Sequence, residues 1–219
     1  MVGVGDYTYE LGGCIMKNRK LNRLVKISLL GVIAFLLMFL EFALPIFPSF
    51  MKIDISDLPA LIGTFALGPE AGIIIEFLKN VLHGIFASQT AFVGELANFA
   101  IGAVLVGTAG IIYKFKKSRA TAVMSLIAGT VTMSIAAAIL NYFVLLPLYE
   151  KAFNFPISQI VAIASKINGN VDSVGTLILW SIIPFNLFKG LALTVLTLVV
   201  YKSVSPILKK EHREGRQAA

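Results

Sequence analysis

Glu76, Lys79 and Asn80 lie in a stretch, residues 58–82, that is otherwise almost wholly apolar. A charge at the centre of a bilayer costs about 2.5–3.5 kcal/mol even on the mildest, insertion-based scale. Such groups persist where they pair, face a protein interior or bind a ligand. Glu76 and Lys79 are three residues apart and share a helix face, with Asn80 beside them. The stretch predicts a membrane protein that holds or transports a polar ligand; a self-satisfying structural ion pair is the alternative.

Three further polar groups lie in the last two apolar segments. Asn141 falls near the outer end of one segment, and Asn186 and Lys189 follow Pro184 in the other. Lys189 is mid-helix, so its ammonium is poorly placed to reach the membrane surface. Amide donors, amide acceptors and a cation at similar depth suit a flat heterocycle that carries carbonyls and ring nitrogens. Hydrogen bonding between helices is the alternative for the asparagines.

The segment that follows the first apolar stretch, residues 44–57, combines prolines with apolar and aromatic side chains. Alternation over residues 50–55 predicts a short extended piece. Asp57 is predicted as a helix N-cap, with Pro59 inside the first turn. The composition leaves two interpretations, an apolar lid over a pocket or a rigid connector at the membrane interface.

Catalytic motifs are missing from the sequence. It contains no Gly-x-Ser-x-Gly, no His-Glu-x-x-His, no phosphate-binding loop and no Cys-x-x-Cys. The single Cys14 excludes a disulfide framework, and with only His83 and His212 the common metal sites are excluded as well. We therefore predict no enzyme, no catalytic residue, no metal and no cofactor. Without a phosphate-binding loop the chain cannot hydrolyse ATP, so active uptake needs a partner or an ion gradient.

The composition predicts an all-α membrane protein, with 57% hydrophobic and 14% charged residues where soluble domains carry about 25% charged residues. Clusters before the first span, between the fourth and fifth spans and at the C-terminus hold 14 of the 19 Lys and Arg residues. Placing all three clusters in the cytoplasm requires six spans, with both termini cytoplasmic and a cytoplasmic turn at Gly68-Pro69. The predicted spans are 24–43, 58–67, 69–87, 92–113, 120–146 and 175–203.

The spans divide the chain into a cytoplasmic tail (1–23), a six-helix substrate-binding domain (24–203) and a basic cytoplasmic tail (204–219). Residues 1–15 have no signal-peptide pattern, and Met16 is a more natural start. We interpret them as a mis-set start or a disordered tail. The segments 44–57, 88–91 and 147–174 are expected to face outward. The net charge of +7 follows from positive residues on the inner side, so no nucleic-acid partner is expected.

The chain resembles a known family over residues 24–203. Its marks are the loop LPIFPSFMKIDISDLPALIG, the turn GPEAG, and the motifs Glu76-Phe-Leu-Lys-Asn80 and Asn186-Leu-Phe-Lys189. These are similar to the riboflavin-binding S components of energy-coupling factor (ECF) vitamin transporters. One departure is that Ser28, Gly31 and Ala34 stand at spacing three, where the family often shows Ala-x-x-x-Ala on the first helix.

The resemblance implies a six-helix fold in the cell membrane of a prokaryote, with riboflavin bound as the transported ligand under the loop after the first helix. It also implies a transmembrane coupling subunit and two cytoplasmic ATPase subunits as partners. The predicted ligand-binding residues are Phe47, Met51, Asp54, Glu76, Lys79, Asn80, Asn98, Asn141, Asn186 and Lys189.

Two functional classes remain open at this stage. One is a vitamin-capturing subunit without enzymatic activity. The other is a stand-alone transporter of a flavin or another vitamin that uses Glu76 or Glu95 as a proton site. An intramembrane enzyme is a third class, which the missing motifs disfavour.

Overall fold

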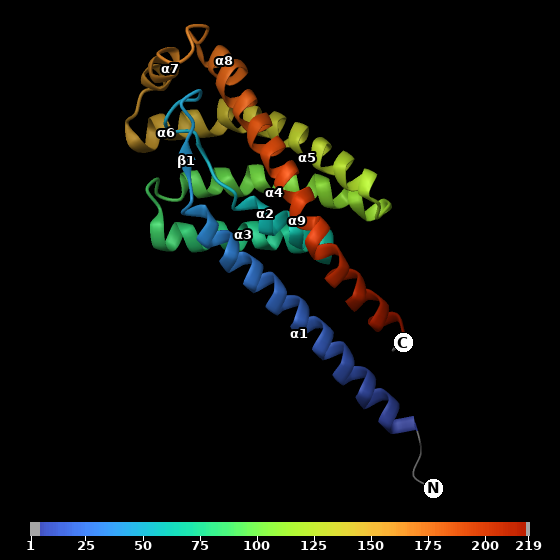
Figure 1. Ribbon diagram of the computed structural model, residues 1–219. Helices are drawn as coiled ribbons and strands as arrows, with labels where there is room; N and C mark the ends of the chain where they lie inside the picture. Colours follow the sequence, from blue (N-terminus) through green and yellow to red (C-terminus); the bar gives the residue numbers. More distant parts are fainter. Residues whose placement is uncertain (1–4, 218–219) are drawn as a thin grey trace.

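The computed structural model describes residues 5–217 of the chain and the side chains of residues 20–200. The fold is almost entirely helical (Figure 1). The long elements are α1 (Gly5–Met38), α2 (Asp57–Leu67), α3 (Pro69–Ala87), α4 (Val93–Phe115), α5 (Arg119–Leu140) and α9 (Ile183–Gln217).

The shorter elements lie together at one side of the molecule, and α1 and α9 extend away from the other side (Figure 1). Strands β1 (Phe42–Ala43) and β2 (Lys52–Ile53) pair in antiparallel register. The helical elements of this side are α6 (Leu146–Phe153), α7 (Ile157–Ser165), α8 (Val174–Leu177) and the π-helical turns η1 (Asn141–Leu145) and η2 (Ile178–Ile182).

The long helices pack in the order α1, α3, α4, α5, α9, and α2 contacts α1, α3, α4 and α9. The α2–α3 turn is made at Gly68, whose φ of 101° favours glycine, and Pro69 begins α3. An apolar core of buried side chains such as Leu61, Ile75 and Leu126 lies among these helices. A second apolar cluster lies on the side of the strands and short helices.

Four helical stretches of the described chain are long and apolar enough to cross a membrane: Lys20–Met38, Val93–Phe115, Arg119–Phe153 and Val174–Val200. Large apolar side chains on α1, α4, α5 and α9 are half or more exposed, among them Leu24, Ile111, Ile135 and Val195. A surface of this kind suits lipid rather than water.

The structure confirms the predicted extended piece, because β2 lies within residues 50–55. Two predicted boundaries were wrong. The first helix ends at Met38 rather than at residue 43, because residues 42–43 pair with β2. The helix predicted to end at 146 continues to Phe153, so the segment 147–174 is partly helical, with α6 and α7 inside it.

The passage of the fifth span through Pro147 has a local cause. At η1 the Leu146 amide donates to the Asn141 carbonyl, five residues back. This wider turn gives room for the proline that follows, which has no amide hydrogen to donate. The same arrangement recurs at η2, where the Ile183 amide donates to the Ile178 carbonyl just before Pro184.

Candidate functional site

The segment between β2 and α2 turns its polar groups into the protein. The Ser56 amide donates to Asp54 Oδ1 over 2.8 Å, a local turn that fixes the carboxylate. The Ser56 hydroxyl donates to the same oxygen. Asp54, Ser56 and Asp57 are all buried. Ser56, not Asp57, is the N-cap of α2, so the N-cap prediction was wrong by one residue, while Pro59 lies in the first turn as predicted.

Lys189 of α9 contacts both aspartates of this segment. Its Nζ lies 3.0 Å from Asp54 Oδ2 and 3.0 Å from Asp57 Oδ2. Burial acts to raise the pKa of the Asp54 carboxyl, but the ammonium groups of Lys189 and Lys79 and the hydrogen bond from Ser56 together outweigh it, and the pKa lies below its usual value. The ion pairs therefore connect the segment before α2 to the last long helix.

Lys79 of α3 connects the same cluster to a third helix. Its ammonium contacts Asp57 Oδ1, lies 2.9 Å from the Ser56 hydroxyl and lies 2.8 Å from Glu76 Oε2. Asp57 thus bridges two lysines. The predicted pairing of Glu76 with Lys79 is present, but it is one contact of a larger cluster. None of the side chains of Glu76, Lys79 and Asp57 is more than 2% exposed.

An apolar surface lies beside this charge cluster. Phe47 and Met51, from the loop between the strands, are buried in an apolar cluster with residues of α9 and of the short helices α6, α7 and α8. The Phe47 ring lies 5.3 Å from the Phe185 ring in an edge-on arrangement and 6.3 Å from the Phe188 ring. The loop between residues 44 and 51 therefore covers the segment of α9 that carries Asn186 and Lys189.

The predicted residues Asn141, at the start of η1, and Asn186, in α9, share one local geometry. Asn141 Nδ2 donates to the Ala137 carbonyl and Asn186 Nδ2 to the Ile182 carbonyl, each over 2.8 Å. Both bonds lie at the edge of a π-helical turn. Each bond uses one amide hydrogen and fixes the orientation of the side chain, which retains its carbonyl oxygen and second hydrogen for a ligand.

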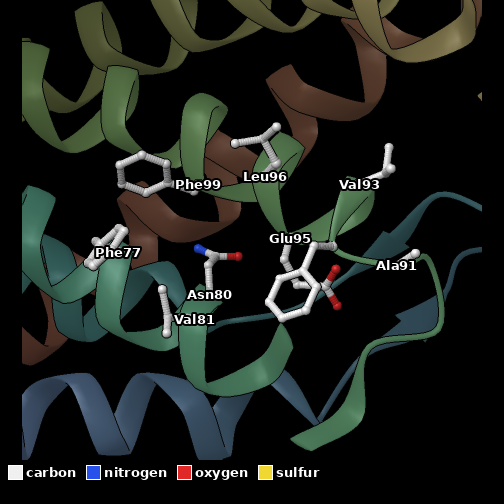
Figure 2. A pocket seen from close by; sticks show the side chains of 9 residues that line it. Phe77, Asn80, Val81, Ala91, Val93, Glu95, Leu96 and Phe99 are labelled. Atoms are coloured by element: carbon white, nitrogen blue, oxygen red, sulfur yellow. The ribbon is translucent and has the colours of Figure 1, made fainter. Parts of the chain in front are cut away.

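Polar residues also line the interface of α3 and α4. His83 Nδ1 lies 2.9 Å from Glu95 Oε1, and the hydroxyls of Ser88 and Thr90 donate to Glu95 Oε2 over 3.1 and 3.3 Å. Next to this group a cavity of about 270 Å³ is lined mainly by apolar side chains. Figure 2 shows Asn80 and Glu95 in its wall, with Phe77 and Phe99 together at one end.

The structure distributes the predicted residues over four groups. Asp54, Glu76, Lys79 and Lys189 meet in the charge cluster, and Phe47 and Met51 lie in the apolar cover. Asn141 and Asn186 flank the π-helical turns, whereas Asn80 and Asn98 belong to the α3–α4 interface. Sequence reasoning missed Ser56 and the two-lysine role of Asp57. The run Asp-Ile-Ser-Asp, with two carboxylates close to the apolar spans, was the available signal.

Comparison with known proteins places this arrangement in a family. The family model "ECF transporter, substrate-specific component" matches residues 22–201. The chain belongs to this family. The riboflavin transporter RibU of Staphylococcus aureus (strain TCH60) is 40% identical over 197 residues, which cover 88% of this chain and 97% of that protein. The riboflavin transporter FmnP of Bacillus subtilis (strain 168) is 34% identical over 194 residues, 88% of this chain and 96% of that protein.

A solved structure of the S component of a bacterial ECF transporter has the same fold. It matches with a TM-score of 0.69 at 37% identity and covers 87% of this chain and 99% of its own. Membership of this family makes the chain a binding and transport subunit rather than an enzyme, as the missing motifs predicted. It also makes the chain a prokaryotic membrane protein.

Proposed function

We propose that this S component captures riboflavin outside the cell membrane and delivers it inward as part of an ECF-type importer. The partners are a transmembrane coupling subunit and two cytoplasmic ATPase subunits, which supply the energy that this chain cannot obtain from ATP. Six membrane-spanning helices, with α2 and α3 as a short pair and both termini cytoplasmic, complete the proposal. The names of the 40% and 34% identical relatives support riboflavin as the ligand.

One observation carries the position of the site. The loop residues Phe47 and Met51 cover the face of α9 at which Asn186 presents an amide with a free carbonyl oxygen. A flavin needs an apolar surface for its rings and hydrogen-bonding groups for its carbonyls and ring nitrogens, and this region offers both. In this proposal the loop moves away to admit the ligand and then closes over it.

The residues proposed to contact the flavin are Phe47, Met51, Asn141, Asn186 and Lys189. Asp54 orients Lys189 through their ion pair. Glu76, Lys79, Asn80 and Asn98 remain predicted members of the polar frame around the ligand, on the side of α3 and α4. The ligand-facing assignment predicts that loss of an asparagine amide weakens binding without unfolding the protein.

Binding can be tested on purified full-length protein by flavin absorbance and by calorimetric titration with riboflavin. Asn186→Ala is expected to weaken binding by about 1 kcal/mol or more, roughly fivefold, the loss of a buried hydrogen bond. Thr194→Ala is the matched control, because Thr194 also donates to the carbonyl one turn earlier on α9 but lies two turns further along. Equal affinity of both variants and wild type would reject this site.

Transport separates the importer from a stand-alone proton-coupled carrier. The chain alone in liposomes is expected to bind riboflavin but not accumulate it under a proton gradient. Accumulation is expected only with the coupling and ATPase subunits and ATP inside the vesicles. Gradient-driven uptake by the chain alone would establish the second class instead.

A further inference from the structure

Three buried oxygen atoms at the α3–α4 interface have neither a hydrogen-bond donor nor an ion-pair partner: Glu76 Oε1, Asn80 Oδ1 and Asn98 Oδ1. Elsewhere in the described part of the chain only Thr130 and Thr197 have a buried side-chain oxygen in this condition. All three interface atoms are acceptors. A buried acceptor without a donor is unfavourable, so three of them on one interface indicate a bound ion or molecule that interacts with oxygen lone pairs.

The backbone places these side chains next to one another across the α3–α4 interface. Asn80 follows Glu76 by one turn of α3, and its Nδ2 donates to the Glu76 carbonyl, which leaves Oδ1 as the free atom. On α4, a Cβ at Gly102 would lie 2.6 Å from Glu76 Oε2, so Gly102 faces this carboxylate. Asn98 precedes Gly102 by one turn on the same face. Because α3 and α4 are consecutive and antiparallel, Asn98 lies opposite Asn80.

The charges of the adjacent cluster do not balance. Three carboxylates (Asp54, Asp57 and Glu76) share two ammonium groups (Lys79 and Lys189). Lys79 Nζ lies 2.8 Å from Glu76 Oε2 and also pairs with Asp57, while Glu76 Oε1 has no partner. With all five groups ionised the cluster carries one uncompensated negative charge in the protein interior, which a single positive charge would neutralise.

The other ionisable groups of the interface do not supply that charge. One turn outward from Asn80, His83 is paired with Glu95, whose second oxygen accepts from Ser88 and Thr90. Asp57 approaches the cluster from α2, Lys189 from α9 and Asp54 from the segment before α2, and their contacts are with each other and with Lys79. The unbalanced charge therefore lies at Glu76.

We infer that Glu76, Asn80 and Asn98 bind one monovalent cation between α3 and α4. Carboxylate and amide oxygens are the ligands that hard cations prefer, and nitrogen or sulfur ligands are absent from this set. The count of charges requires a single positive charge. That charge is supplied either by a sodium ion or by a proton on Glu76. Each of the two neutralises the same carboxylate.

The test is the melting temperature of the purified full-length protein without flavin, so it does not depend on the proposed ligand. Sodium chloride replaces choline chloride at constant ionic strength, over a range of pH. If sodium ion is bound, the melting temperature is expected to rise by about 5 °C or more as the site fills. If a proton is bound instead, the melting temperature rises as the pH falls, and sodium has no effect on it.

Variants assign the effect to the site. Glu76→Gln is expected to abolish either dependence, because it removes the negative charge. Asn98→Leu leaves the charge cluster intact. It is expected to raise the cation concentration that gives half of the stabilisation at least fivefold. This variant replaces Glu76→Gln in the test if Glu76→Gln does not fold. Thr197→Val is the matched control, since it removes a buried oxygen without a partner on α9, and it should retain the wild-type response. The inference is overturned if the melting temperature of the wild type responds to sodium and pH in the same way as that of Glu76→Gln. If Glu76→Gln does not fold, the same comparison is made with Asn98→Leu.

Discussion

Lys189 and Asp54 are 135 positions apart in the chain, yet Lys189 Nζ lies 3.0 Å from Asp54 Oδ2 and both side chains are buried. Asp57 forms an ion pair with the same ammonium and a second ion pair with Lys79. The segment before α2 is thereby connected to α9 and α3 at once. Because that segment continues from the loop that carries Phe47 and Met51, the position of the loop depends on this ion cluster.

The first prediction concerns this pair. Lys189→Met should lower the free energy of unfolding by about 3–5 kcal/mol, because it leaves Asp54 and Asp57 buried with Lys79 as their single cation. Asp54→Asn should have a smaller effect. The double variant should lose less unfolding free energy than the sum of the losses of the two single variants. Thermal unfolding of the flavin-free protein measures all three.

The matched control for this cycle is Lys52→Met. Lys52 pairs with Glu41 across the strands, but their side chains are 41% and 37% exposed. An exposed pair contributes about 0–1 kcal/mol, so this variant should unfold close to wild type. Strict additivity of Asp54→Asn and Lys189→Met would contradict a direct coupling.

The second prediction is the pH dependence of the same contact. The folded-state pKa of Asp54 lies below the ordinary value of 3.8. Its contribution to stability is therefore complete above that ordinary value and is lost as the pH falls through the lower, folded-state pKa. Asp54→Asn lacks this contribution at every pH. The difference in unfolding free energy between wild type and Asp54→Asn should be constant near neutrality and shrink only in strong acid; a difference that shrinks already between pH 7 and 5 would contradict it.

The third prediction concerns Gly102. A Cβ there would lie 2.6 Å from Glu76 Oε2 and 2.9 Å from its Cδ, so Gly102→Ala must displace a buried carboxylate. We expect a loss of about 1–3 kcal/mol. Gly107→Ala on the same helix is the control, since its Cβ would lie 3.8 Å from Ile73 Cδ1, an ordinary contact. In a Glu76→Ala background the cost of Gly102→Ala should largely vanish, and an undiminished cost would assign the effect to the helix backbone.

The sequence was sufficient for features that depend on neighbours along one helix. The Glu76–Lys79 contact follows from their spacing, and the turn at Gly68 follows from glycine and proline chemistry. The binding of Asp54 and Asp57 by Lys189 does not, because spacing says nothing about partners on distant segments. Asp57 looked like a helix cap because an aspartate before a helix usually is one.

The π-helical turns were equally hidden from the sequence. Pro147 was expected to lie outside the fifth span, whereas η1 provides a wider turn and the helix continues to Phe153. Hydropathy does not distinguish a π-helical turn from an α-helical one, since the extra residue changes the register and not the composition. The positions of Asn141 and Asn186 beside such turns could therefore be located along the helices, but their orientation could not.

The last prediction addresses the loop over α9. Phe47 is buried against Phe185 and Phe188, whereas Phe50 in the same loop is 47% exposed. Phe47→Ala should weaken riboflavin binding at least tenfold and raise the dissociation rate, because a fully buried aromatic side chain contributes about 1.5–3 kcal/mol. Phe50→Ala, the matched control, should bind within about twofold of wild type. Stopped-flow measurement of flavin fluorescence gives both rates. If the two variants release riboflavin equally fast, burial of Phe47 does not hold the loop closed, and the loop is a connector rather than a lid.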